Sequence, residues 1–377
     1  MIESNLLVSP DELRTVLVRQ GSNKTVVIDV REPDEFAEWR IAKSVNFPLT
    51  DRNFLGNVEK YAGRRQIVAV CTRGNRSFYA MDLLRGAGMR AWSLEGGLVN
   101  WSKIHLSSRV QVPGLTGAEI IQVRRLLRGC TSYLVVANKE CAVFDPSSDT
   151  EQYTSIAGRC GFRITHVIDT HQHADHVSGA RLLADTTGAK LHFNGLEEYA
   201  FDDFEPVQEG DRILLDRGSI TIDAIHTPGH TVGSTCFLIE NRALISGDTL
   251  FLDGFGRPDL HRREDTRARD LYRSCSKIFL TLDPEVIVLP GHFGMTEDTW
   301  EGKSLSRTLA QIDTDLRLTS ASESEFVQTL LANELPPPSN YRSIISVNRG
   351  ESRLDPALVD LLEEGHNRCV LPIAPFR

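Results

Sequence analysis

The sequence predicts an α/β protein of two domains, in which a small N-terminal domain with a parallel sheet precedes a larger domain built on a layered sheet. Three observations support this. The 377 residues exceed what one hydrophobic core usually organises. Short apolar runs alternate with helical patterns near the N-terminus, whereas later runs outnumber the helices that could separate them. A composition of 41% hydrophobic and 25% charged residues is typical of globular chains.

The elements of the first domain follow from its apolar runs. Thr25–Val30 (TVVIDV) and Gln66–Cys71 (QIVAVC) predict buried parallel strands. Ser77–Gly86 has helical spacing with a glycine stop, and paired glycines in Glu95–Trp101 predict a closing turn. Ser107–Gly117 carries Ser, Pro and Gly with little periodicity, which predicts a linker. We therefore expect a first domain over residues 1–108 and a second over residues 115–377.

The second domain is expected to contain a large mixed or layered sheet. Its apolar runs predict strands at Ser132–Ala137, Cys141–Phe144, Ile164–Asp169, Ile220–Ile225, Cys236–Ile239, Ala243–Ile245 and Val286–Leu289. Residues from about 312 to 377 are expected to form a helical extension. Ser322 with Glu325, and later Asp355 with Pro356, give patterns that start helices.

Charge and composition exclude several classes of function. A net charge of −9 argues against binding nucleic acid, which normally needs a basic surface. No apolar run approaches the roughly 20 residues that span a membrane, and the N-terminal residues lack the pattern of an export signal. The seven cysteines form no CxxC pair, which favours a reducing compartment over a disulfide framework. We therefore expect a cytoplasmic protein with no membrane partner.

Cys71 has the most informative surroundings of the seven cysteines. It ends an apolar strand, and Thr72–Arg76 (TRGNR) follow before a helix begins. A loop at this junction turns backbone N–H groups inward, and the helix dipole adds positive potential. Both effects favour the thiolate, which is the reactive form of cysteine. Arg73 and Arg76 would strengthen them and could hold an anionic substrate.

The run CTRGNR, with IDVREPDEF before it and EGGLVNW after it, resembles the rhodanese family over essentially residues 1–105. The resemblance implies a sulfurtransferase domain in which Cys71 carries a persulfide sulfur. Related phosphatases use a similar loop that is one residue longer from cysteine to arginine. Sulfur transfer therefore ranks ahead of phosphate hydrolysis, and also ahead of an inert docking module.

A second motif, THQHADH, follows the strand predicted to end at Asp169 and predicts a metal site. It offers four potential ligands within six residues, which are His171, His173, Asp175 and His176. Further candidates recur just beyond other predicted strands, namely His230 in HTPGHT, Asp248 in SGDT and His292 in LPGH. Loops at strand ends can converge, so these side chains can meet. Spacing alone leaves open whether they hold one metal or two.

This set resembles the metallo-β-lactamase superfamily over roughly residues 115–310, which implies an αββα sandwich with a metal site along one edge. Within it, SGDTLFLDGFGRPDL and the HxHADH run look like the persulfide dioxygenases. That resemblance implies one Fe(II) per chain, held by His171, His230 and Asp248, with positions left open for a persulfide and O₂.

The remaining members of the set would then orient the ligands or move protons: His173, Asp175, His176 and His292. Asp175 and His176 are the catalytic candidates among them. In dinuclear hydrolases of the same fold these residues instead hold a second metal, so two Zn or mixed metals are the alternative. Arg257 and Asp259 in GFGRPDL are candidates for substrate contact or for bracing the loop beside Asp248.

The two motifs in one chain predict an enzyme of sulfur metabolism. The second domain would oxidise a low-molecular-weight persulfide such as glutathione persulfide to sulfite with O₂. The first would exchange sulfane sulfur with sulfite or thiosulfate through Cys71. The main rival is a dinuclear thioester hydrolase of the glyoxalase II kind with a regulatory rhodanese module. Many relatives of the dioxygenase type are dimers or tetramers, so the resemblance also implies a homo-oligomer.

Overall fold

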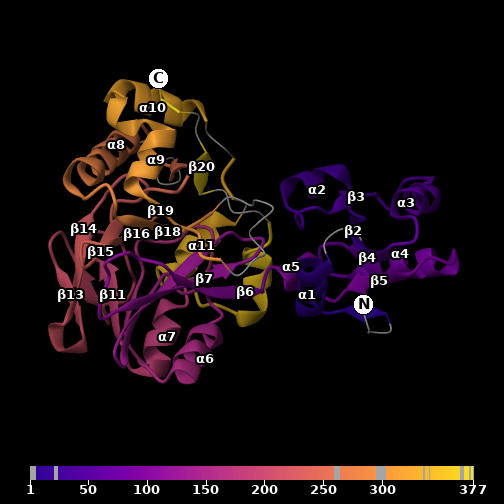
Figure 1. Ribbon diagram of the computed structural model, residues 1–377, viewed down its shortest axis with the longest axis horizontal. Coiled ribbons are helices and arrows are strands. Elements are labelled where there is room, and N and C mark those ends of the chain that lie inside the picture. The colour runs from indigo at the N-terminus through magenta and orange to yellow at the C-terminus, as the bar shows by residue number, and fades with distance from the viewer. Residues whose placement is uncertain are drawn as a thin grey trace.

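The computed structural model describes residues 6–20, 24–258, 264–293, 303–333, 336–338, 340–365, 369–372 and 375–376. It confirms the predicted fold class, with a small parallel sheet followed by two larger sheets (Figure 1). None of the described helices combines the length and the apolar character that crossing a membrane requires.

The N-terminal region is a five-stranded parallel sheet in the order β1-β5-β4-β2-β3. The central strands β2 and β4 are buried along their whole length, as expected for continuous apolar runs covered by helices on both faces. Its elements are β1 Leu7–Val8, α1 Pro10–Gln20, β2 Thr25–Asp29, α2 Pro33–Glu38, β3 Val45–Asn46, α3 Phe54–Ala62, β4 Gln66–Val70, α4 Asn75–Gly86, β5 Ala91–Leu94 and α5 Gly97–Trp101.

The linker predicted from Ser107 onward is wrong in its first half. His105–Val110 is strand β6, which pairs along its length with β7 at the edge of the seven-stranded sheet. Alternating burial along β6 carries Leu106 and Val110 inward, a period-2 pattern that its polar residues conceal. The chain therefore enters the second sheet before residue 108.

The C-terminal region contains two facing sheets. The first has the order β12-β11-β10-β9-β8-β7-β6 and the second the order β13-β14-β15-β16-β18-β19. The strands of the first are β6 His105–Val110, β7 Glu119–Arg125, β8 Thr131–Ala137, β9 Glu140–Phe144, β10 Arg163–Ile168, β11 Lys190–Asn194 and β12 Glu205–Val207. Those of the second are β13 Arg212–Leu215, β14 Ile220–His226, β15 Thr235–Ile239, β16 Ala243–Gly247, β18 Ile287–Pro290 and β19 Arg307–Thr308.

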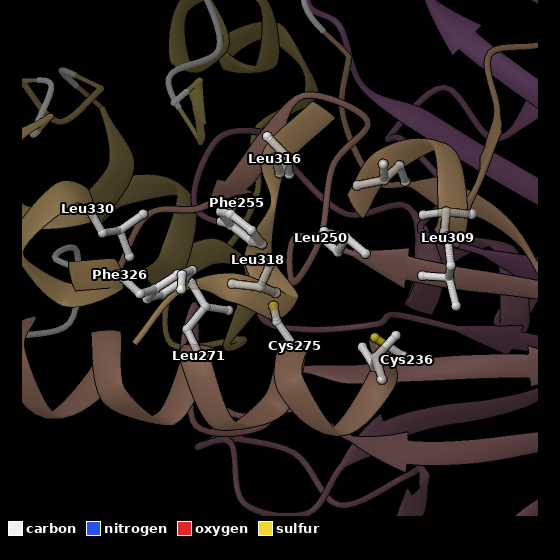
Figure 2. Packing of buried hydrophobic residues seen from close by; sticks show 14 of the residues in the cluster. Cys236, Leu250, Phe255, Leu271, Cys275, Leu309, Leu316, Leu318, Phe326 and Leu330 are labelled. Carbon is white, nitrogen blue, oxygen red and sulfur yellow. The ribbon is translucent and has the colours of Figure 1, made fainter. Parts of the chain in front are cut away.

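Helices cover the outer faces of both sheets and complete the predicted αββα sandwich (Figure 1). α6 Glu151–Cys160 and α7 Ala180–Thr187 pack on the first sheet. α8 Glu264–Thr281, α9 Leu309–Leu316 and α10 Glu323–Ala332 pack on the second. Figure 2 shows this outer core, in which Leu271 and Cys275 of α8 face Leu318 and Phe326. The apolar layer between the sheets, with Phe144 against Phe237, holds the strand ends in fixed relation.

Beyond α10, the C-terminal extension contacts both the sandwich and the first domain. It contains α11 Tyr341–Asn348, α12 Val359–Leu362 and β20 Val370–Pro372, which pairs with β17 Gly254–Gly256. The two regions also share an apolar cluster, in which Trp101 and Ile104 pack with Leu126 and Leu127. Just after α12, Glu364 pairs with Arg73 and Glu363 accepts from Val177 N, so this segment reaches both candidate sites.

Candidate metal centre and thiol loop

The predicted metal ligands converge beyond the ends of four strands. His171–His176 follow β10, His230 lies between β14 and β15, Asp248 follows β16 and His292 follows β18. These residues are all 2% exposed or less, so water reaches them little. Gly247 permits this approach because it has φ +49° and because a Cβ there would lie 2.5 Å from Thr170 Oγ1.

His171, His230 and Asp248 direct three buried atoms toward one another. Asp248 Oδ2 lies 3.8 Å from His171 Nε2 and 3.6 Å from His230 Nε2. None of these three atoms has a hydrogen-bond partner within the described part of the chain. Buried polar atoms are rarely left unpaired, so three that meet at one point indicate a site for a cation. The donor set of two imidazoles and one carboxylate fits a divalent metal ion.

Hydrogen bonds behind the ligands fix which imidazole nitrogen faces the centre. His171 Nδ1 donates to Thr170 Oγ1 at 2.9 Å, because that hydroxyl donates its own proton to Asp145. His230 Nδ1 donates to the carbonyl of Arg257 at 2.7 Å. Each ring thus presents an unprotonated Nε2 to the centre, which is the form that binds a metal.

The electrostatics of the triad agree with this arrangement. Burial, with His173 adding to it, lowers the pKa of His171 well below its usual range, and burial also lowers the pKa of His230. Burial opposes ionisation of Asp248, but His292 and His171 outweigh it and lower the pKa of the carboxyl. Two neutral imidazoles and an ionised carboxylate are ready to bind a metal without first losing protons.

The other members of the motif form a hydrogen-bonded chain beside the triad. His292 Nδ1 lies 2.7 Å from Asp248 Oδ1, and its Nε2 lies 2.9 Å from Asp175 Oδ2. His176 Nδ1 lies 3.1 Å from the other oxygen of Asp175. Burial acts against a charged His292, but Asp248 and Asp175 outweigh it and raise its pKa well above the usual range.

Several residues outside the predicted set support this centre. Asp145 follows β9 and accepts hydrogen bonds from Thr170 N at 2.7 Å and from His173 Nε2 at 3.2 Å. Cys130 Sγ lies 3.5 Å from Asp175 Oδ2. Like the predicted ligands, Asp145 lies just beyond the end of a buried strand, and this position is visible in the sequence. Cys130 carries no comparable signal in the sequence.

The C-terminal extension holds the histidine loop from outside. Asn348 of α11 donates to the carbonyls of His173 and His176, both at 2.9 Å. Glu363 accepts from Val177 N at 2.8 Å. These contacts join residues more than 170 positions apart in the chain, so no local sequence pattern predicts them.

Of the proposed substrate contacts, Arg257 lies inside the protein. It is 0% exposed, and its guanidinium donates to the carbonyl of Pro336 at 3.3 Å. Its own carbonyl orients His230, so the structure gives it the bracing position. Asp259 lies outside the described residues.

The thiol loop forms a separate site in the first domain. Cys71 directly follows β4, and its Sγ accepts N–H hydrogen bonds from Gly74 at 3.2 Å and Ser77 at 3.3 Å. The loop closes tightly on Gly97, whose φ is +61° and whose Cβ, if present, would lie 2.2 Å from the carbonyl oxygen of Cys71. Inward N–H groups around the sulfur are what the strand-to-helix junction predicts.

Both arginines of the loop are held by carboxylates. Arg76 pairs with Glu35 of α2, and Arg73 pairs with Glu364 of the C-terminal extension. An anionic substrate would therefore meet guanidinium groups that already have partners.

Comparison with known proteins finds a matching family for each of the two regions. Residues 125–292 match the family described as the metallo-beta-lactamase superfamily, and residues 10–104 match the rhodanese-like domain. The chain is 29% identical to the mitochondrial persulfide dioxygenase ETHE1 of Bos taurus, over 56% of this chain and 79% of that protein. It is 34% identical to a hydroxyacylglutathione hydrolase of Polaromonas sp., over 43% of this chain and 61% of that protein.

A solved structure has a similar fold over the second region. The crystal structure of ETHE1 from Myxococcus xanthus aligns with a TM-score of 0.53 and 25% identity, and the match covers 60% of this chain and 96% of that one.

Proposed function

We propose that this chain is a persulfide dioxygenase with an attached sulfurtransferase, because residues 125–292 match the metallo-beta-lactamase superfamily and residues 10–104 match a rhodanese-like domain. The dioxygenase reaction balances as RSSH + O₂ + H₂O → RSH + SO₃²⁻ + 2 H⁺. The persulfide would be of low molecular weight, such as glutathione persulfide.

The observation that carries this proposal is the convergence of three buried atoms, from His171, His230 and Asp248, that have no hydrogen-bond partner among the described residues. Two imidazoles and one carboxylate are the donor set typical of non-haem iron(II) oxygenases. When bound there, iron(II) supplies a redox-active centre with open positions for the persulfide and O₂. Both nitrogens of His292 lie within hydrogen-bond distance of carboxylates, which is the arrangement of a residue that orients a metal ligand.

The chain from Asp248 through His292, Asp175 and His176 is suited to handle the two protons that the reaction releases. His292 connects two carboxylates, one on the triad and one on the histidine loop. Asp175 lies between two rings, with His292 at one carboxylate oxygen and His176 at the other, so it connects them in one hydrogen-bonded chain. Thr170 and Arg257 meanwhile keep the ligand rings oriented through their Nδ1 hydrogen bonds.

In the sulfurtransferase step, Cys71 would carry the sulfane sulfur. Transfer to sulfite balances as Cys71–S–S⁻ + SO₃²⁻ → Cys71–S⁻ + S₂O₃²⁻, and the reverse reaction draws persulfide sulfur from thiosulfate. The N–H groups of Gly74 and Ser77 that face Sγ stabilise the thiolate released in this step. The sulfite made by one domain is thus a substrate for the other.

Anaerobic purification followed by metal analysis and an oxygen-electrode assay tests the proposal. We expect close to one iron per chain and O₂ consumption that depends on glutathione persulfide. Two zinc ions per chain, with no O₂ consumption, would contradict it.

A dinuclear thioester hydrolase is the second candidate, and one observation favours it. Cys130, Asp175, His176 and His292 place donor atoms within 4.8 Å of one another, and His176 Nε2 has no hydrogen-bond partner in the described part of the chain. Hydrolysis of S-lactoylglutathione by a sample with two metals per chain would select this candidate.

A further inference from the structure

The two arginines of the thiol loop differ in how firmly they are held. Arg76 donates to both carboxylate oxygens of Glu35, at 2.7 and 2.6 Å. Glu35 is also fixed by its position in the first turn of α2, where it accepts from the backbone N–H of Glu32. A two-point pair with an anchored carboxylate leaves Arg76 little freedom to turn toward a substrate.

Arg73 instead reaches into the second domain. Its Nη2 lies 2.6 Å from Glu364 Oε2, and the two side chains are 47% and 31% exposed. An ion pair with one short contact between half-exposed, flexible side chains contributes little to stability. An anion that binds Arg73 can therefore displace Glu364 more readily than it can displace Glu35 from Arg76.

The sulfurtransferase step brings such an anion to this place. Sulfite and thiosulfate are dianions, and either must approach Cys71, two residues before Arg73 in the same loop. We propose that Glu364 is a specificity-determining residue of the sulfurtransferase, an internal carboxylate that competes with the sulfur oxyanion for Arg73. This inference rests on the sulfurtransferase activity proposed above.

The position of Glu364 links this competition to the metal centre. Its neighbour Glu363 pairs with Arg125 at 2.7 Å and accepts from Val177 N in the histidine loop. Arg128 donates to the carbonyls of Glu363, Gly365 and Asp175. Glu364 also lines a cavity of about 150 Å³ together with Arg128 and Asp175, so a displaced carboxylate has room to move. The second domain thereby sets how strongly the first binds its donor.

Thiosulfate binding to the full-length chain tests the inference. In a Cys71→Ser background, where no turnover occurs, we expect Glu364→Gln to lower the Kd for thiosulfate by about fivefold or more in calorimetry. Glutamine keeps the size of the side chain and removes its charge. With Cys71 present, the same substitution should lower the KM for thiosulfate by a similar factor and leave kcat unchanged.

Asp360→Asn is the matched control. Asp360 pairs with Lys103 at 2.7 Å between the same two regions and with similar exposure, but this pair does not touch the loop. Its Kd and KM should stay at the wild-type values. Unchanged or weaker binding in Glu364→Gln, or no thiosulfate binding in any variant, would overturn the inference. If the wild-type chain transfers sulfur and Glu364→Gln has the same KM for thiosulfate, only this inference is overturned. If the wild-type chain transfers no sulfur at all, the proposed function is contradicted.

Discussion

The thiol loop and the metal centre of this chain are built in opposite ways. The loop takes its groups from one short stretch, in which Gly74 and Ser77 surround Cys71 with backbone N–H donors, and its arginines are half exposed. The centre collects side chains from the ends of strands in both sheets and buries all of them. A loop of the first kind depends on local backbone shape, whereas a centre of the second kind depends on the whole sandwich. A substitution that abolishes the activity of one site should therefore leave the other site active.

Removal of a proposed metal ligand should give the largest effect. We expect Asp248→Ala to lose its iron and to lower persulfide-dependent O₂ uptake by at least about a hundredfold, because it removes the only carboxylate of the triad. Metal analysis and the oxygen electrode measure both quantities. Sulfur transfer from thiosulfate should persist, and iron retained at the wild-type level would count against the ligand assignment.

Removal of the thiol should give the converse result. Cys71→Ser is expected to abolish sulfur transfer from thiosulfate to cyanide, because no sulfur remains to carry the persulfide. Iron content and O₂ uptake should stay at the wild-type values. If transfer survives the substitution, the first domain is a docking module and not a sulfurtransferase.

A residue behind the ligands should have an intermediate effect. Asp145→Asn removes the charge that accepts from Thr170 N and from His173, so the orientation of His171 through Thr170 should loosen. We expect iron affinity to fall about 10- to 100-fold in a competition with a chelator. Asp223→Asn, in an exposed pair with Arg212, is the control and should leave the affinity unchanged.

The backbone of the thiol loop can be tested through its close contact. Gly97→Ala places a Cβ 2.2 Å from Cys71 O at a φ of +61°, so we expect a loss of about 1–3 kcal/mol in the free energy of unfolding. Gly63→Ala has nearly the same φ, +58°, with nothing within 4 Å of its Cβ, and should lose less. Equal losses in thermal unfolding would show that the close contact does not matter.

The smallest effect concerns His105, on the strand that joins the two regions. Burial, with Arg125 adding to it, lowers the pKa of His105 to about 4. The unfolded chain takes up this proton near pH 6.5 and the folded chain does so only near pH 4. The stability from a neutral His105 is therefore complete above about pH 6.5 and is lost as the pH falls toward 4. His105→Asn should flatten the dependence of stability on pH in that window.

The sequence predicts more of the two sites than of what surrounds them. Strands such as β4, β10 and β16 are continuous apolar runs, so the residues that follow them could be placed at strand ends. β6 overlaps the predicted linker because its polar face and neighbouring Pro and Gly conceal its period of two. Asn348 and Glu363 could not be predicted, because their contacts join segments that no local pattern relates.

The position of β6 affects any attempt to separate the two activities by cutting the chain. Its six residues pair with β7, so cleavage at residue 108 would split an edge strand and leave the backbone donors and acceptors of β7 open to other molecules. A fragment of the sandwich that begins before His105 keeps this edge closed. We expect such a fragment to stay monodisperse at concentrations where one that begins at residue 109 aggregates.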